Sequence, residues 1–291
     1  MRPSLWTGMF HKFNIPIEDT IQRLSVVGFR AAELCGPYLD RLSSKPNSLE
    51  SAKSIRALCD EKKLAISQAH GPTLPFASSE WFEREKACAT IESLFPLLET
   101  LGVRTLVLHP GQPEEPQVEH LNSRFPWTVA WGDCAKLNAE SFQRLSDVSG
   151  KFGIRIAIEN LIDGKISGRR MFGAHPVDLE MLLAKVPELG LNLDTAHAHA
   201  QHLDLPTLIH HCGQRLHGLH VSDNHGELHD KHLIPGKGTI NWSEVIAALK
   251  KVGYQGDFHL ELPHERDDSI ETTTRLAHKA YLTAVNLLEG M

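Results

Sequence analysis

Six short apolar stretches of the sequence end in side chains that bind metal ions or transfer protons. These stretches end at His70, His109, Glu159, Asp194, His220 and Glu261. One such residue at the end of a strand is more often a surface group or a hydrogen-bonded core group. Three carboxylates brought together would repel one another, and a divalent cation such as Zn²⁺ or Mn²⁺ would relieve that repulsion. The set indicates metal chemistry, provided that the fold brings its members together.

The segments that carry these residues alternate with longer segments of helical period. Strands are expected at Leu5–Phe10, Ala31–Cys35, Leu64–His70, Arg104–His109, Arg155–Glu159, Gly190–Asp194, Gly218–Val221 and Phe258–Glu261. Four glycines stand where a helix would end before a strand: Gly28, Gly102, Gly153 and Gly253. Eight strand–helix units without a break in composition predict one (β/α)8 TIM barrel, a single domain over residues 1–291. The strand ends then meet at the C-terminal rim, where active sites of this fold lie.

Two loops at the same rim add further candidate ligands. His197 follows the sixth strand in LDTAHAHA and can turn back into the site. Asp230 and His232 are two residues apart in LHDKHLIPGKGTINW, so both can face one ion in an extended loop. Gly236 and Gly238 follow them and leave the backbone open to close approach by a ligand. A loop at this position is also a common phosphate-binding element of such barrels.

The loop after the fifth strand is basic. It carries Lys165, Arg169 and Arg170, which could attract a phosphate or carboxylate on a substrate. A solvated basic loop accounts for the three residues equally well, so their role in substrate binding is a hypothesis.

Composition limits the compartment and the partners. No stretch approaches the roughly 18 apolar residues of a membrane span, and the N-terminus has no apolar segment of signal-peptide length. The five cysteines are scattered without a CxxC pair, which favours a reducing cytoplasm. The net charge of −6 disfavours non-specific binding to nucleic acid. A small-molecule substrate is therefore expected, no membrane partner is expected, and a homo-oligomer stays open.

The segments AIENL, LDTAHAHA, GLHVSDN, HLIPGKGTINW and FHLEL resemble the xylose isomerase-like barrel superfamily. That superfamily includes ketose epimerases, inosose dehydratases and abasic-site endonucleases of the endonuclease IV type. For the sugar enzymes the resemblance implies one divalent metal held by Glu159, Asp194, His220 and Glu261. It also implies that Glu159 and Glu261 move protons and that His197 contacts the substrate.

The endonuclease branch implies a larger metal site. Its three zinc ions have nine ligands, which match His70, His109, Glu159, Asp194, His197, His220, Asp230, His232 and Glu261. Other segments depart from that branch: the first strand reads LWTGMFHKF rather than a GAHxS type, and HGPTLPF lacks the expected tyrosine. The second strand, FRAAELC, looks like the sugar enzymes, with Glu33 at its end. One ion is therefore expected, and up to three are chemically reasonable.

These observations favour a metal-dependent isomerase or epimerase of a sugar, a sugar phosphate or a keto-polyol. The metal would act as a Lewis acid on a carbonyl and the adjacent hydroxyl, and Glu159 and Glu261 would transfer the proton through an enediolate. One alternative is a zinc phosphodiesterase that acts at abasic DNA sites. Another is a related metal-dependent sugar lyase or dehydratase. A barrel that binds a sugar without converting it is disfavoured, because both glutamates are present.

Overall fold

The computed structural model describes residues 1–113, 131–163, 170–229, 231–262 and 269–290. Its eight strands are β1 (Pro3–Trp6), β2 (Ala31–Leu34), β3 (Ala65–His70), β4 (Thr105–Leu108), β5 (Arg155–Glu159), β6 (Gly190–Asp194), β7 (Leu216–His220) and β8 (Phe258–Leu260). The strand pairs are parallel, and the order in the sheet runs from β7 down to β1 and then to β8.

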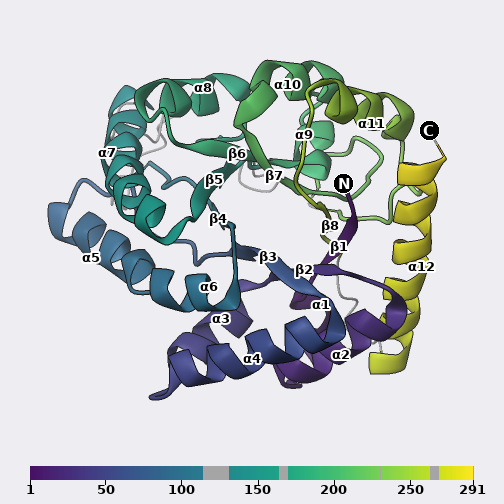
Figure 1. Ribbon diagram of the computed structural model, residues 1–291. Coiled ribbons are helices and arrows are strands. Elements are labelled where there is room, and N and C mark those ends of the chain that lie inside the picture. The colour runs from purple at the N-terminus through teal and green to yellow at the C-terminus, as the bar shows by residue number, and fades with distance from the viewer. Residues whose placement is uncertain (114–130, 164–169, 230, 263–268, 291) are drawn as a thin grey trace, which may run out of the picture.

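The sheet closes between its two edge strands. Val221 forms a parallel bridge with Leu260, and its amide donates a hydrogen bond of 2.7 Å to the carbonyl of His259. The strands therefore form a barrel in the middle of the molecule, with helices around it (Figure 1). The predicted single (β/α)8 barrel is confirmed.

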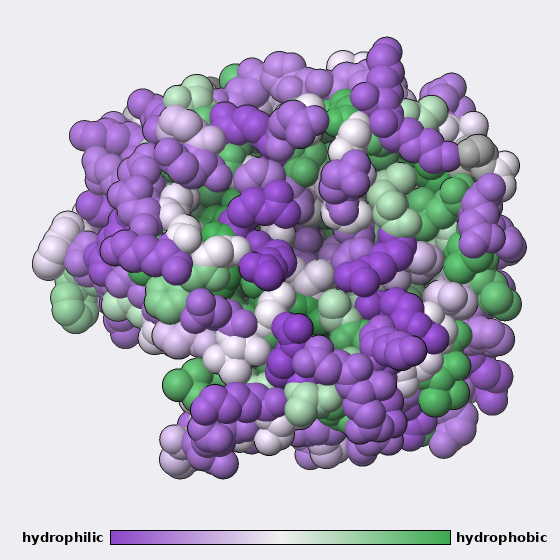
Figure 2. Space-filling view, in the orientation of Figure 1, coloured by the Kyte–Doolittle hydropathy of each residue, from purple (hydrophilic) through white to green (hydrophobic). Residues whose placement is uncertain are grey.

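Twelve α-helices cover the described part of the barrel. They are α1 (Gly8–His11), α2 (Ile17–Val27), α3 (Gly36–Ser43), α4 (Ser48–Lys62), α5 (Trp81–Glu92), α6 (Phe95–Leu101), α7 (Trp131–Ser149), α8 (Pro176–Lys185), α9 (Thr195–Ala200), α10 (Leu205–Cys212), α11 (Trp242–Lys251) and α12 (Ile270–Glu289). Short 3-10 turns at Gly150–Phe152 and Gly213–Arg215 follow α7 and α10. The helices turn mostly hydrophilic side chains outward on the face seen in Figure 2. Within the described ranges, no helix is both long and apolar enough to cross a membrane.

The helix α11 illustrates why the outer layer packs on the barrel. Its buried positions include Trp242, Val245, Ile246 and Leu249, which recur with the spacing of one helical face. The side chain of Asn241 caps the first turn by accepting a hydrogen bond from the amide of Glu244. One face thus joins the core while the other meets water.

The first strand was predicted too long. It ends at Trp6, and Gly8–His11 form α1 instead of continuing the strand. Met9 and Phe10 are fully buried in that helical turn. A short buried helix has the same run of apolar residues as a strand, so periodicity cannot separate the two.

Candidate metal-binding active site

Four predicted ligands meet at the C-terminal rim of the barrel. Glu159, Asp194 and His220 are the last residues of β5, β6 and β7, and Glu261 directly follows β8. Each offers a ligand atom, and these atoms all lie within 4.8 Å of one another. Three of the four residues are almost fully buried, and the side chain of Glu261 is 18% exposed. The parallel strands thus gather the four side chains that were predicted to bind one ion.

Glu159 is the residue on which most contacts converge. Its Oε2 lies 3.1 Å from His70 Nε2 and 3.2 Å from His109 Nε2. Its Oε1 lies 3.0 Å from His220 Nδ1. His70, His109 and Glu159 form a second group whose donor atoms could hold a metal ion. Both histidines therefore stand beside the site, as the sequence predicted.

A third group of possible ligands consists of Asp194, His197 and His232. Asp194 caps α9, and its Oδ1 accepts a hydrogen bond of 2.7 Å from the amide of His197. His197 therefore lies on a one-turn helix rather than in a loop. Its Nδ1 donates to the carbonyl of Asn160 at 2.8 Å, because a carbonyl can only accept. His232 Nδ1 lies 2.9 Å from Ser222 Oγ and 3.9 Å from Glu261 Oε2.

Two buried carboxylate oxygens at this site are suited to bind a cation. Asp194 Oδ2 is buried and has no hydrogen-bond partner among the described residues, while Glu261 Oε2 is buried with His220 Nδ1 as an ion-pair neighbour at 3.0 Å. A buried carboxylate oxygen without a partner is costly, so it needs a proton, a donor or a metal ion nearby. Carboxylates and imidazoles are the donors that Zn²⁺ and Mn²⁺ accept. The donor set therefore fits a divalent cation.

The electrostatics of the cluster also indicate a shortage of positive charge. Burial raises the pKa of Asp194 to about 6, because His197 and His232 offset only part of that effect. Burial also opposes the charge on Glu261, but His220 outweighs it and lowers the pKa of Glu261 to about 2. For His220, burial opposes protonation, yet Glu261, Glu33 and Glu159 raise its pKa well above the usual value. Without a metal ion, a protonated His220 is the main counter-charge.

A pocket of about 430 Å³ opens onto this site, and its lining includes Glu159, Glu261 and the four neighbouring histidines His70, His109, His197 and His232. Trp6, Asp40, Gly36, Pro37 and the segment from Gly71 to Thr73 complete the lining. The Trp6 ring packs against Gly8, where an added Cβ would overlap it. The pocket thus combines an aromatic surface with carboxylates and imidazoles, a lining that suits a polyhydroxylated molecule.

The other predicted binding residues lie elsewhere or outside the described residues. Lys165, Arg169 and Asp230 belong to the latter. Arg170 pairs with Asp178 at 2.9 Å and stacks over the Trp131 ring at 4.3 Å. Gly236 and Gly238 lie in the turn that surrounds Asp223: the Gly236 amide donates to Asp223 Oδ2, and a Cβ on Gly238 would overlap Asp223 and Asn224. A substrate-binding role for Arg170 and the two glycines stays a prediction.

Several residues of the site were not predicted from the sequence. Asn160 exchanges two hydrogen bonds with the backbone of Asp194, at 2.7 and 3.0 Å, and so ties β5 to β6 beside the ligands. Its position directly after Glu159 was the available signal. Trp6, the last residue of β1, and Asp40, on α3, also line the pocket, and no local pattern marks them.

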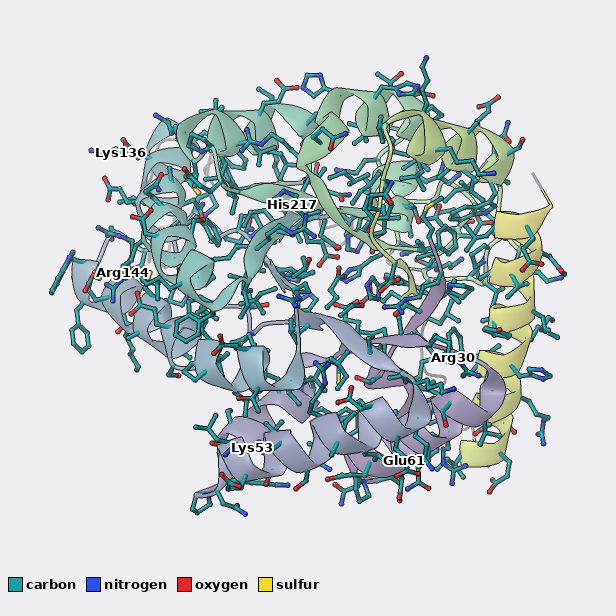
Figure 3. The ribbon with its side chains drawn as sticks, in the orientation of Figure 1. Arg30, Lys53, Glu61, Lys136, Arg144 and His217 are labelled. Carbon is teal, nitrogen blue, oxygen red and sulfur yellow. The ribbon has the colours of Figure 1, made fainter. Side chains whose placement is uncertain are left out.

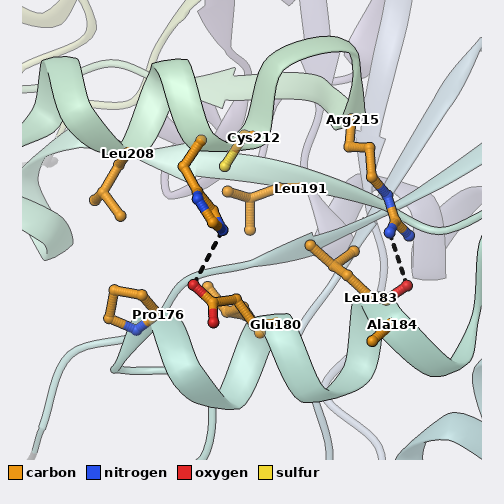
Figure 4. A pocket seen from close by; sticks show the side chains of 10 residues that line it. Pro176, Glu180, Leu183, Ala184, Leu191, Leu208, Cys212 and Arg215 are labelled. Atoms are coloured by element: carbon orange, nitrogen blue, oxygen red, sulfur yellow. Dashed lines mark hydrogen bonds and ion pairs between the residues drawn. The ribbon is translucent and has the colours of Figure 1, made fainter.

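A second cavity of about 280 Å³ lies on the outside of the barrel, between α8 and α10 (Figure 4). Leucines, Pro176, Ala184 and Cys212 line most of it. An ion pair of 3.0 Å between Glu180 and His211 joins the two helices. Arg215, at its end, donates hydrogen bonds to the carbonyls of Leu183, Val186 and Leu189. This lining offers no cluster of groups comparable to the rim site.

Known proteins share this architecture. A D-psicose 3-epimerase of Enterocloster bolteae is 24% identical over 246 residues, 81% of this chain and 73% of that protein. The structure of a D-psicose 3-epimerase with D-tagatose from Clostridium cellulolyticum H10 superposes with a TM-score of 0.81 at 16% identity, covering 99% of this chain and 100% of that one. The IOLI protein, solved with a zinc atom, gives a TM-score of 0.80 at 17% identity and covers 100% and 99% of the two chains. The model of the protein family described as xylose isomerase-like TIM barrel matches residues 21–284, so the chain belongs to that family.

Proposed function

We propose that this protein is a divalent-metal-dependent isomerase or epimerase of a sugar or keto-polyol. The observation that carries the proposal is the convergence of Glu159 and Glu261 on His220, with Asp194 beside them. Relatives of this chain include a D-psicose 3-epimerase and an inosose isomerase of Bacillus subtilis, which supports sugar chemistry. Zinc in the IOLI structure supports a metal site in this family.

Glu159, Asp194, His220 and Glu261 would hold the cation. A divalent cation bound there supplies Lewis acidity, which polarises a carbonyl of the substrate and acidifies the adjacent C–H bond. Zn²⁺ and Mn²⁺ both accept carboxylate and imidazole donors, so either ion suits this donor set.

The two glutamates would move the proton. One carboxylate removes it from the carbon beside the carbonyl, and the other returns it to the enediolate on the same carbon or its neighbour. General acid–base catalysis of this kind is typically worth about 10²- to 10⁴-fold in rate. His197, held by the Asn160 carbonyl, would contact a hydroxyl of the substrate. Such a proton abstraction is shared with sugar lyases and dehydratases, which stay within the proposal as related activities.

The pocket supports an uncharged substrate. Among its described lining residues, none is Lys or Arg, and Asp40 adds a carboxylate near the opening. Arg and Lys are the side chains that commonly bind phosphate, and Arg170 is paired with Asp178 instead. We therefore place free ketoses and keto-polyols ahead of sugar phosphates.

Solvent exchange tests this function directly. The protein, loaded with Zn²⁺ or Mn²⁺, is incubated in D₂O with a panel of ketoses and keto-polyols, and deuterium at carbon is measured by NMR. We expect incorporation with the correct substrate and its loss in Glu261→Gln. The variant Glu180→Gln, on the outside of the barrel, serves as the control and should exchange at the normal rate. Full exchange in Glu261→Gln would contradict the proposed role of this residue.

A second candidate function is supported by one specific observation. The described residues contain three groups of donors that could each hold an ion, and these groups include eight of the nine positions that match the endonuclease ligands. A zinc phosphodiesterase acting at abasic DNA sites is therefore the alternative.

A further inference from the structure

A polar layer lies beneath the ligands, inside the barrel. Glu33 on β2 is fully buried, as are Gln68 on β3 and Asn192 on β6, with at most 2% exposure. The interior of such barrels is usually filled by layers of branched apolar side chains. A carboxylate buried at this depth is costly unless a charged or hydrogen-bonding partner stabilises it. Glu33 therefore needs a partner that justifies its position.

That partner is His220. Glu33 Oε1 lies 3.0 Å from His220 Nε2. On the other side of the ring, His220 Nδ1 lies 3.0 Å from both Glu159 Oε1 and Glu261 Oε2. A neutral imidazole that gives Nδ1 to a metal ion carries its proton on Nε2, and Glu33 is the group placed to accept that hydrogen bond. The nitrogen that faces the metal-binding carboxylates is then Nδ1.

The surrounding residues hold Glu33 in place. Gln68 Nε2 donates to Glu33 Oε2 at 3.3 Å and to Asn192 Oδ1 at 3.2 Å. Gly218 on β7 leaves the room for these amides, because an added Cβ would overlap Asn192 Oδ1 and would lie 2.6 Å from Gln68 Oε1. Residues from β2, β3, β6 and β7 thus combine to aim one carboxylate at one nitrogen.

We propose that Glu33 is a positioning residue for the metal site: it accepts the Nε2–H of His220 and so orients Nδ1 toward the ion. The inference rests on the proposed function, since it requires a metal ion held by His220. A carboxylate behind a ligating imidazole fixes the tautomer and the ring orientation, and losing such a group typically weakens metal binding by about 10- to 100-fold.

Zinc affinity provides the first test. Zn²⁺ is titrated into the metal-free protein against a competing chelator dye, for the wild type and for Glu33→Gln, Glu33→Asp and Ser4→Ala. We expect Kd to rise about 10- to 100-fold in Glu33→Gln. Glu33→Asp retains the charge and should recover part of the affinity. Ser4→Ala is the matched control, because Ser4 is equally buried but contacts His259 rather than His220.

The tautomer of His220 provides a readout that a merely structural role would not change. In the zinc-loaded wild type labelled with ¹⁵N-histidine, NMR should show His220 protonated at Nε2 and coordinated through Nδ1. Glu33→Asp should keep this pattern, and Glu33→Gln should lose the protected Nε2 proton.

The outcomes separate this inference from the proposed function. A wild type that binds no zinc overturns both. A wild type that binds zinc at Nδ1, while Glu33→Gln keeps its Kd within about twofold, overturns the role of Glu33 alone. Coordination through Nε2 in the wild type also overturns it.

Discussion

Asp194 combines two tasks in one carboxylate. Its Oδ1 caps α9 by accepting the His197 amide, and its Oδ2 is buried among the ligands with no partner in the described residues. The N-terminus of a helix attracts negative charge, so the cap steadies the carboxylate in its position. The buried strand β6 therefore ends in an acid because one carboxylate oxygen caps α9 and the other faces the site at the rim of the barrel.

The double variant Glu159→Gln/Asp194→Asn tests the metal site at the residue scale. It removes two negative charges from the cluster while keeping the side-chain shapes, so the cation loses two of its four donors. We expect about one ion per chain in the wild type after dialysis, and a large loss in the variant, measured by elemental analysis.

The matched control is Glu50→Gln/Asp60→Asn, two exposed carboxylates of α4. It should keep the metal content of the wild type. Unchanged metal content in the Glu159/Asp194 variant would mean that the ion is bound somewhere else.

At the scale of elements, the sequence revealed most of the barrel but not its short helices. The glycines that were expected to end helices, Gly28, Gly102, Gly153 and Gly253, all have positive φ, which confirms the units that they separate. The turns α1 and α9 were missed because a single buried turn has too few residues for a helical period. The convergence of Glu159, Asp194, His220 and Glu261 was predictable because each stands at the end of an apolar strand. Glu33 was seen at the end of its strand, but its contact with His220 depends on barrel closure.

The close packing around Gly218 of β7, inside the barrel, leads to a prediction for Gly218→Ala. An added methyl group would overlap Asn192 Oδ1 and crowd Gln68, and both amides are buried in hydrogen bonds. Overpacking of this kind typically costs about 1–3 kcal/mol of unfolding free energy. We expect a lower midpoint in urea unfolding. Gly150→Ala, where an added Cβ meets nothing within 4 Å, should remain close to the wild type. Equal midpoints for the two variants would show that the polar layer can shift without cost.

At the scale of the whole molecule, acid should weaken folding through a histidine at the start of β7. Burial lowers the pKa of His217 to about 4, with Arg155 adding to the effect, and its Nδ1 has no hydrogen-bond partner among the described residues. Figure 3 shows His217 near the middle of the barrel. In the unfolded chain a histidine has a pKa of about 6.5. Between pH 6.5 and 4 the unfolded state therefore binds more protons, so stability is full above this window and falls as pH decreases through it.

The contribution of His217 can be isolated by substitution. We expect the free energy of unfolding to fall by roughly 3 kcal/mol between pH 7 and pH 4 on account of this residue. That part of the pH dependence should disappear in His217→Phe. His278→Gln, on the exposed side of α12, is the control and should keep the wild-type slope. An unchanged slope in His217→Phe would assign the acid sensitivity to other groups.

All five cysteines are free, and four of them are buried. Burial raises the pKa of Cys134 to about 12, so this thiol stays protonated and unreactive. Burial likewise raises the pKa of Cys35 and of Cys59 to about 11. These thiols therefore act as small apolar core groups rather than as nucleophiles.

The charge of the whole chain favours the sugar enzyme over the phosphodiesterase. An abasic-site endonuclease must hold several phosphates of a duplex with cations, and its binding must weaken steeply with salt. This chain has a net charge of −6, and the described lining of its pocket contains carboxylates and imidazoles but no Lys or Arg. With Zn²⁺ or Mn²⁺ supplied, we expect no appreciable cleavage of a duplex that carries an abasic site, as measured on a denaturing gel. The same preparation should exchange the C–H proton of its ketose, which shows that the metal site is intact. Efficient cleavage that is lost in Glu159→Gln would instead establish the phosphodiesterase, because the same ligands would then activate water against a phosphate.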